Sequence, residues 1–202
     1  MRALMEALFF STLVVALAEM GDKTQLLALV LTARFRRPWP IVLGILLATV
    51  LNHALAGAVG AWVVQWLGQE ALRWVLGLSF IAMAVWMLVP DKLEDDDSVH
   101  GNPGWGVLLT TTVAFFLAEM GDKTQVATVM LAAQYQAFVW VVAGTTLGML
   151  LANAPVVWWG DKLVRKLPIR LVHGASALIF LVLGVLALLG DGALLEVSPA
   201  QP

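Results

Sequence analysis

The chain contains no cysteine, which excludes disulfide bonds, thiolate metal sites and thiol catalysis. Charged residues are also scarce, at 13% of the 202 residues, against about 25% in a typical globular protein. The formal net charge of −2 provides no basic surface, so no nucleic-acid partner is expected. Any chemistry must therefore come from a few charged and polar side chains.

Hydrophobic residues make up 60% of the chain, more than a soluble domain of this length could bury. A helix needs about 20 apolar residues to cross a bilayer, and nothing here alternates like a barrel strand. Several of the nine tryptophans lie where apolar stretches end, as in an interfacial belt. The sequence predicts an all-α integral membrane protein with six transmembrane helices, at residues 4–32, 39–64, 71–90, 105–133, 137–160 and 169–190.

Positive charge predicts the orientation of these helices. Of the 12 Lys and Arg, eight fall in the first, third and fifth loops, two lie within spans, and only Arg2 and Arg73 lie on the other side. Cytoplasmic loops carry the excess of positive charge. We therefore expect the odd-numbered loops to be cytoplasmic and both termini to lie on the opposite side, with the first apolar run retained as a span.

One nine-residue motif occurs twice. The segment Leu17–Gln25 reads LAEMGDKTQ, and Leu117–Gln125 is identical and lies 100 positions later. The chain is thus predicted to be a duplication, with a first three-helix repeat at 1–90, an acidic cytoplasmic loop at 91–104 and a second three-helix repeat at 105–202. Because three crossings is an odd number, the two repeats must be inverted in the membrane, as in many secondary transporters.

The acidic residues of the motif predict a cation site. Glu19 and Asp22 are spaced i,i+3, as are Glu119 and Asp122, so each pair is expected on one helix face. An acid deep in the membrane costs at least about 2.5 kcal/mol on insertion scales, so a functional role is the default. Oxygen-only donors suit Mg²⁺, Ca²⁺ and Mn²⁺. The candidate ligands are Glu19, Asp22, Thr24, Gln25 and Asn52 with Glu119, Asp122, Thr124, Gln125 and Asn153.

Other residues of the motif have two interpretations each. Lys23 and Lys123 could pair with a carboxylate while no cation is bound, and a cation or proton would then replace the ammonium. Gly21 and Gly121 could weaken the helix, or let another helix approach closely.

The neighbouring methionine, asparagine and histidine side chains also have two interpretations each. Met20 and Met120 could add a thioether, which would favour Mn²⁺, or could simply pack. Asn52 and Asn153 could bind the ion or make interhelical hydrogen bonds. His53 could be a packed imidazole or a proton relay.

Carboxylates must lose their protons to bind a metal, so exchange of a divalent cation for protons is the leading hypothesis. An exporter of a basic amino acid or another small cationic solute is the main alternative. A membrane enzyme would need an open coordination position and a substrate path, and a scaffold would not need buried acids. We therefore expect a transporter and no enzyme, without a prosthetic group, and monomeric because the fused halves complete the site.

The doubled Glu-x-Gly-Asp-Lys-Thr motif, at Glu19–Thr24 and Glu119–Thr124, resembles that of the Gdt-type cation/proton exchanger family. The resemblance extends over nearly the whole chain, including the acidic central loop. It implies export of Mn²⁺, and of Ca²⁺ as a further substrate, with the four motif acids as ion-binding residues. The short termini resemble those of bacterial members, which implies the bacterial inner membrane.

Overall fold

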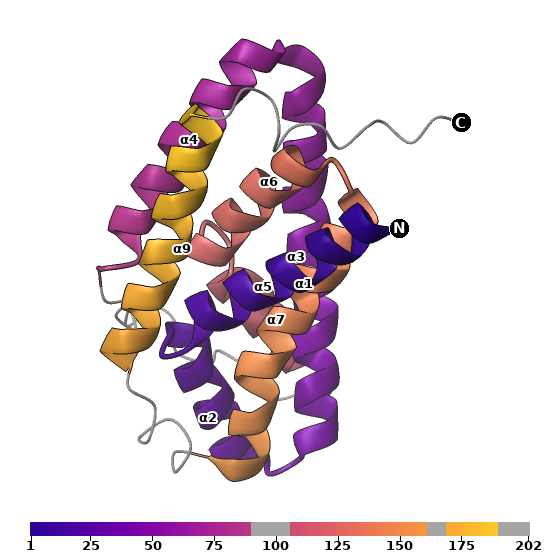
Figure 1. Cartoon of the computed structure of the whole chain (residues 1–202). Coiled ribbons are helices and arrows are strands. Elements are labelled where there is room, and N and C mark those ends of the chain that lie inside the picture. Colours follow the sequence, from indigo (N-terminus) through magenta and orange to yellow (C-terminus); the bar gives the residue numbers. More distant parts are fainter. Residues whose placement is uncertain (90–105, 161–168, 190–202) are drawn as a thin grey trace.

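The computed structural model of the chain describes residues 1–89, 106–160 and 169–189, and the acidic central loop lies outside them. Within these ranges all regular structure is helical (Figure 1). The helices are α1 (Arg2–Glu19), α2 (Lys23–Phe35), α3 (Pro38–Trp66), α4 (Gln69–Trp86), α5 (Val107–Ala118), α6 (Lys123–Tyr135), α7 (Phe138–Trp159) and α9 (Ile169–Leu189).

Several of these helices are suited to a bilayer. Among the described residues, α3, α7 and α9 are each long and apolar enough to cross a membrane alone, and the bent pair α1–α2 would make a fourth span. Large apolar side chains face outward along them, including Leu171, which is 74% exposed. A surface of this kind needs lipid rather than water around it. The all-α membrane character is confirmed, whereas the count of six spans stays a prediction.

Two predicted helices are not continuous. The stretches 4–32 and 105–133 were expected to be single helices, but each is broken at its motif, between α1 and α2 and between α5 and α6. The first break bends the chain by 72°. The expectation that each Glu and the Asp three residues later share one helix face is therefore wrong, because the glutamates lie at the end of one helix and the aspartates at the start of the next.

Helices from different halves pack against each other. The long helix α7 packs on α1, α3 packs on α5, and α4 packs on α9. A Cβ at Gly144 would lie 2.5 Å from the carbonyl oxygen of Leu8, and one at Gly44 would lie 2.6 Å from the Cβ of Thr111. Two glycines 100 positions apart thus permit the same close approach in both halves.

The buried apolar residues form two clusters. One cluster is built by α1, α4, α6 and α9 with Val141 of α7, and it contains the Phe80–Phe180 ring contact at 6.2 Å. The other is built by α2, α3, α5 and α7 with Val15 of α1. The α4–α9 pair therefore contributes its buried residues to one cluster and not to the other.

Aromatic residues mark the ends of the molecule. Trp39 contacts Trp158 at one end, with ring centroids 5.5 Å apart, and Trp62 contacts Trp66 at the other end of α3, with centroids 5.9 Å apart. All four are exposed. This is the arrangement expected where tryptophans lie at the two membrane interfaces.

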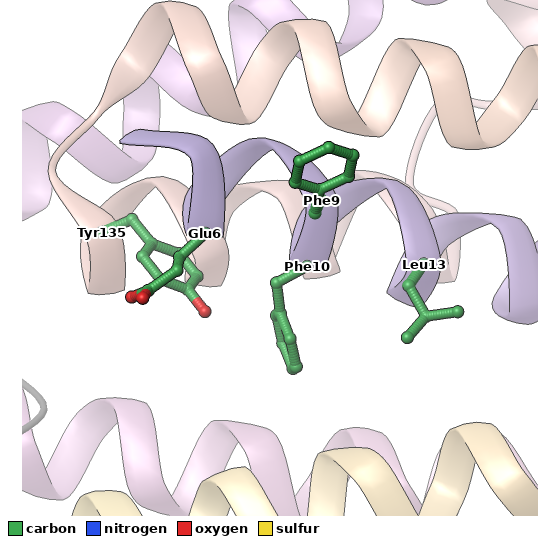
Figure 2. Close-up of a pocket in the computed structure, with 5 residues that line it drawn as sticks. All are labelled: Glu6, Phe9, Phe10, Leu13 and Tyr135. Atoms are coloured by element: carbon green, nitrogen blue, oxygen red, sulfur yellow. The ribbon is translucent and has the colours of Figure 1, made fainter. Parts of the chain in front are cut away.

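A groove of about 430 Å³ runs along the first half of α1 (Figure 2). Four residues of α1 and Tyr135 at the end of α6 line it, and the Phe10 and Tyr135 rings lie 6.1 Å apart. The groove is mainly apolar, with Glu6 beside Tyr135 at one end, and it does not include the motif acids.

Candidate functional site

Both copies of the motif fold into the same backbone break. Gly21 has φ 85° and Gly121 has φ 76°, values that favour glycine. Asp22 and Asp122 follow with extended backbones, at φ −78°, ψ 167° and φ −80°, ψ 167°, and each begins a new helix. Of the two interpretations of these glycines, Gly121 supports the first, since a Cβ there would meet nothing within 4 Å.

A glutamine side chain closes each break. The Gly21 amide donates to Gln25 Oε1 at 2.9 Å, and the Gly121 amide donates to Gln125 Oε1 at 2.8 Å. Gln25 also donates from Nε2 to the carbonyl of Ala152 in the other half, at 2.9 Å. Gln125 lines a second groove of about 290 Å³ between α3 and α6. The glutamines, predicted as ligands, therefore already serve the backbone that shapes the site.

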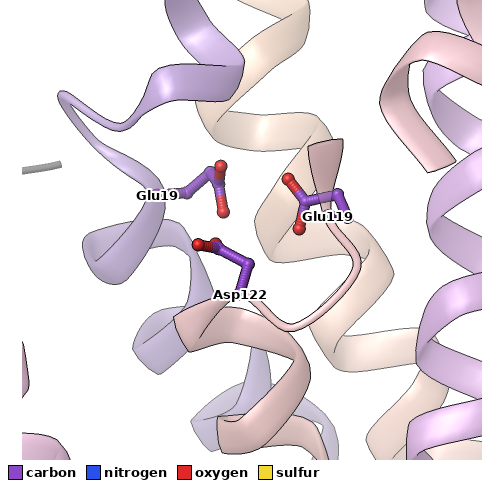
Figure 3. Close-up of side chains that lie close together, drawn as sticks. All are labelled: Glu19, Glu119 and Asp122. Atoms are coloured by element: carbon purple, nitrogen blue, oxygen red, sulfur yellow. The ribbon is translucent and has the colours of Figure 1, made fainter. Parts of the chain in front are cut away.

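The two breaks bring three carboxylates together. Glu19, Glu119 and Asp122 each offer one oxygen, and these oxygens all lie within 4.8 Å of one another (Figure 3). The two glutamates are fully buried, and Asp122 is 6% exposed. Asp22, also buried, lies within electrostatic range of Glu119. The acids that the sequence pairs within each half thus meet across the two halves.

With all three carboxyl groups ionised, this cluster would carry more negative charge than a buried site can hold alone. Three ionised carboxylates at this separation repel one another, and burial removes the water that would otherwise screen them. A divalent cation, protons or a basic side chain must supply compensating positive charge. Part of it is present, because Lys23 Nζ lies 3.8 Å from Asp122 Oδ1.

Threonine hydroxyls hold the two glutamates. Thr24 Oγ1 donates to Glu19 Oε1, and Thr124 Oγ1 donates to Glu119 Oε2 at 2.9 Å. The second oxygen of each glutamate is buried and makes no hydrogen bond among the described residues. Each glutamate is therefore fixed through one oxygen and leaves the other without a hydrogen bond in the described part of the chain.

Each of the two asparagines uses its amide nitrogen as a donor and leaves its oxygen without a hydrogen bond among the described residues. Asn52 donates to the carbonyl of Phe116 at 3.0 Å, and Asn153 donates to the carbonyl and sulfur of Met149 at 3.2 and 2.9 Å. Asn153 lies beside the Glu19 carboxylate. Both Oδ1 atoms are buried without a hydrogen bond in the described part of the chain. The interhelical bond predicted for Asn52 is present, and its oxygen stays available for an ion.

The lysines behave differently from each other. Lys23 does pair with a carboxylate, but with Asp122 of the other half rather than with Glu19 four residues earlier. Lys123 is 2% exposed and donates to the carbonyl of Val89 at 2.8 Å. The lysines therefore connect the breaks to neighbouring elements.

The remaining candidates lie around this centre. Met120 is 57% exposed and Met20 is half-buried, so neither thioether is as deeply enclosed as the acids. His53 is fully buried, and neither ring nitrogen makes a hydrogen bond within the described ranges.

Sequence reasoning assigned no role to His173. Its Nε2 lies 3.1 Å from the carbonyl oxygen of Met20 at the first break. The sequence offers one signal for it. The motif repeats after 100 residues, and His173 lies 100 residues after Arg73, so the two polar residues occupy equivalent positions in the two halves.

Comparison with known proteins identifies the family of the chain. The sequence profile of the divalent cation/proton antiporter GDT1 matches residues 7–95 and 107–193. The chain belongs to the GDT1 family. A protein of Vibrio cholerae named "Putative manganese exporter" is 49% identical over 90% of both chains. A GDT1-like protein of Synechocystis is 27% identical over 87% of this chain and 93% of its own length.

More distant GDT1 relatives occur in plants. GDT1-like protein 3 of Oryza sativa is 27% identical over 88% of this chain and 72% of its own length. No solved structure matches the chain significantly.

Proposed function

We propose that this GDT1-family protein exports Mn²⁺ from the cytoplasm in exchange for protons, with Ca²⁺ as a further substrate. The observation that carries the proposal is the meeting of Glu19, Glu119 and Asp122, three buried carboxylates from two identical motifs. The three atoms that these residues offer are carboxylate oxygens, which suit hard divalent cations. The name of the Vibrio cholerae relative supports manganese as the cargo and export as the direction.

Charge balance supplies the coupling. The cluster needs positive charge in every state, and a divalent cation and protons can satisfy that need in turn. Release of the cation to one side would let protons bind from that side, and the loaded carboxylates would then carry them back. Asp22, with the free oxygens of Asn52 and Asn153, would complete the coordination of the ion, and Lys23 would partly neutralise Asp122 in the empty site.

The same duplication supports alternating access. Two three-helix repeats, at 1–90 and 105–202, would lie inverted in the membrane and share one site between them, as in other inverted-repeat transporters. The cytoplasmic loop at 91–104 would join them, both termini would lie outside the cytoplasm, and the protein would work as a monomer in the bacterial inner membrane.

The test is manganese flux into proteoliposomes that contain an internal pH reporter. Wild-type protein is compared with Glu119→Gln, which removes a charge from the cluster, and with the control Glu6→Gln, which removes an exposed charge paired with Arg2 outside the site. We expect Mn²⁺ and protons to move in opposite directions, Glu119→Gln to be inactive and the control to be active.

The outcomes separate the alternatives. If correctly inserted wild-type protein moves neither Mn²⁺ nor Ca²⁺, the cation assignment is wrong. Competition by lysine in the same vesicles would then favour an exporter of a basic amino acid.

A further inference from the structure

The α4–α9 pair packs against only one of two equivalent sides of the molecule. By the 100-residue repeat, α4 corresponds to α9, α1 to α5 and α2 to α6. In the structure α9 contacts α1 and α4 contacts α6, whereas between the described residues of the equivalent pairs, α4 with α5 and α9 with α2, there is no comparable contact. The buried residues agree, since α4 and α9 contribute to the cluster with α1 and α6.

A polar contact joins this pair to the first break. His173 on α9 places Nε2 3.1 Å from the carbonyl oxygen of Met20. Met20 directly follows the last residue of α1, where carbonyl groups lack partners within the helix. A histidine N–H that donates here satisfies one such carbonyl and holds α9 against the end of α1.

The equivalent residues in the other half are Arg73 on α4 and Met120 at the second break. Arg73 Nε is buried and makes no hydrogen bond within the described residues. Its guanidinium lies 5.8 Å from the Trp74 ring centroid. Met120 is 57% exposed, whereas Met20, whose carbonyl contacts His173 of α9, is half-buried. The second half thus has a donor and a carbonyl at the matching positions, without the contact.

We propose that His173–Met20 and Arg73–Met120 are alternative contacts of the α4–α9 pair, one for each end state of the transport cycle. The inference rests on the proposed alternating access, in which inverted repeats exchange their conformations. In the second state α4 lies against α5 and α9 against α2, Arg73 donates to the Met120 carbonyl, and His173 leaves the Met20 carbonyl.

Each contact can then bias the equilibrium. A contact present in one state and absent in the other stabilises only the first, and its removal shifts the population toward the other state. His173 and Arg73 are accordingly positioning residues, which act on the site through the two breaks without touching the ion. Loss of either one should change the ratio of states about five- to tenfold, as expected for one hydrogen bond.

The test measures distances between spin labels, which the cysteine-free chain accepts at introduced cysteines without background. One label pair joins α9 to α2, at Leu171 and Val30, and the other joins α4 to α6, at Val75 and Val126. All four positions are exposed. In the second state the first distance shortens and the second lengthens.

The two variants should shift these populations in opposite directions. His173→Ala is expected to favour the second state, and Arg73→Ala the state described here. Arg73→Lys, which keeps a donor, should stay close to wild type, and Arg170→Ala on α9 is the matched control without a shift. If an alanine variant does not fold, His173→Leu or Arg73→Leu, each without a side-chain donor, takes its place.

The inference is overturned if the Arg73 variant leaves the populations unchanged or shifts them in the same direction as the His173 variant. If His173 and Arg73 had only a structural role, their variants would lower the stability of the protein without shifting the two populations in opposite directions. The distances are read without any flux. Failure of wild-type transport would therefore defeat the proposed function alone, and transport without opposite shifts would defeat only this inference.

Discussion

At the scale of single residues, each copy of the motif divides its side chains between the carboxylate that is the proposed ligand and the groups that hold that carboxylate and the backbone in place. The glutamate presents one free oxygen, and the threonine five residues later holds the other. The glutamine satisfies the glycine amide at the break. Ligands with such outer hydrogen bonds are orientated before the ion arrives, so loss of the outer partner weakens binding without removing a ligand.

Thr124→Val tests this division. The variant removes the hydroxyl that donates to Glu119 but keeps the shape of the side chain. We expect the KM for Mn²⁺ flux to rise about 10- to 100-fold, with a smaller change in the maximal rate. The dependence of flux on Mn²⁺ concentration measures both quantities.

Thr112→Val is the matched control, because that hydroxyl donates to the backbone of Leu108 on the exposed side of α5. Its KM should equal that of wild type. Equal KM values for both variants would show that Thr124 does not orientate a ligand.

At the scale of elements, the decisive feature is the broken helix. A continuous helix would carry Glu119 and Asp122 on one face, whereas the break turns the chain between them and lets both carboxylates meet Glu19. The break depends on a backbone conformation that glycine adopts without strain.

Gly121→Ala should therefore disturb the second break. The space around the position is open, so the cost comes from the positive φ and amounts to about 1–2 kcal/mol of folding free energy. We expect a lower midpoint of thermal unfolding together with weaker Mn²⁺ transport. Gly106→Ala is the control, since Gly106 also lies in open space but has φ −67°. A Gly121 variant as stable and active as the control would contradict this account.

The helical class was predictable from the sequence, and the doubled motif picked out the acids that the structure brings together, but the break was not predicted. Apolar residues continue on both sides of Gly21 and Gly121, so hydropathy alone suggests one long helix. The two glycines stand out in the sequence. However, glycine is expected both where a helix is weakened and where two helices pack closely, so its presence did not distinguish the two roles. Glu19 meets Asp122 only because particular helices of the two halves cross. Glycines such as Gly44 permit these crossings through contacts with residues far away in sequence, and the sequence alone does not show those contacts.

At the scale of the whole molecule, the two halves are interlocked. The first helix of each half packs on the long helix of the other, and the carboxylate cluster draws on both halves. The carboxylate cluster therefore lies between the halves, which is the position that the proposed alternating access of two inverted repeats requires.

The orientation of the molecule can be measured directly on single-cysteine variants. Gly68→Cys, between α3 and α4, should react with a membrane-impermeant thiol reagent in intact bacterial cells with a permeabilised outer membrane. Arg36→Cys, between α2 and α3, should react only after the inner membrane is opened, because the positive charge around it predicts a cytoplasmic position. The reverse pattern would invert the assigned topology, and with it the proposed direction of export.

The packing of α1 on α7 has a consequence for biosynthesis. A ribosome releases α1 long before it makes α7, which begins at Phe138, so α1 enters the bilayer without its main partner. Until then Glu19 lacks its neighbours from the second half, and the side of α1 that packs on α7 in the complete protein faces lipid. The first half must therefore wait in the membrane as an incomplete intermediate, and assembly becomes possible only near the end of translation.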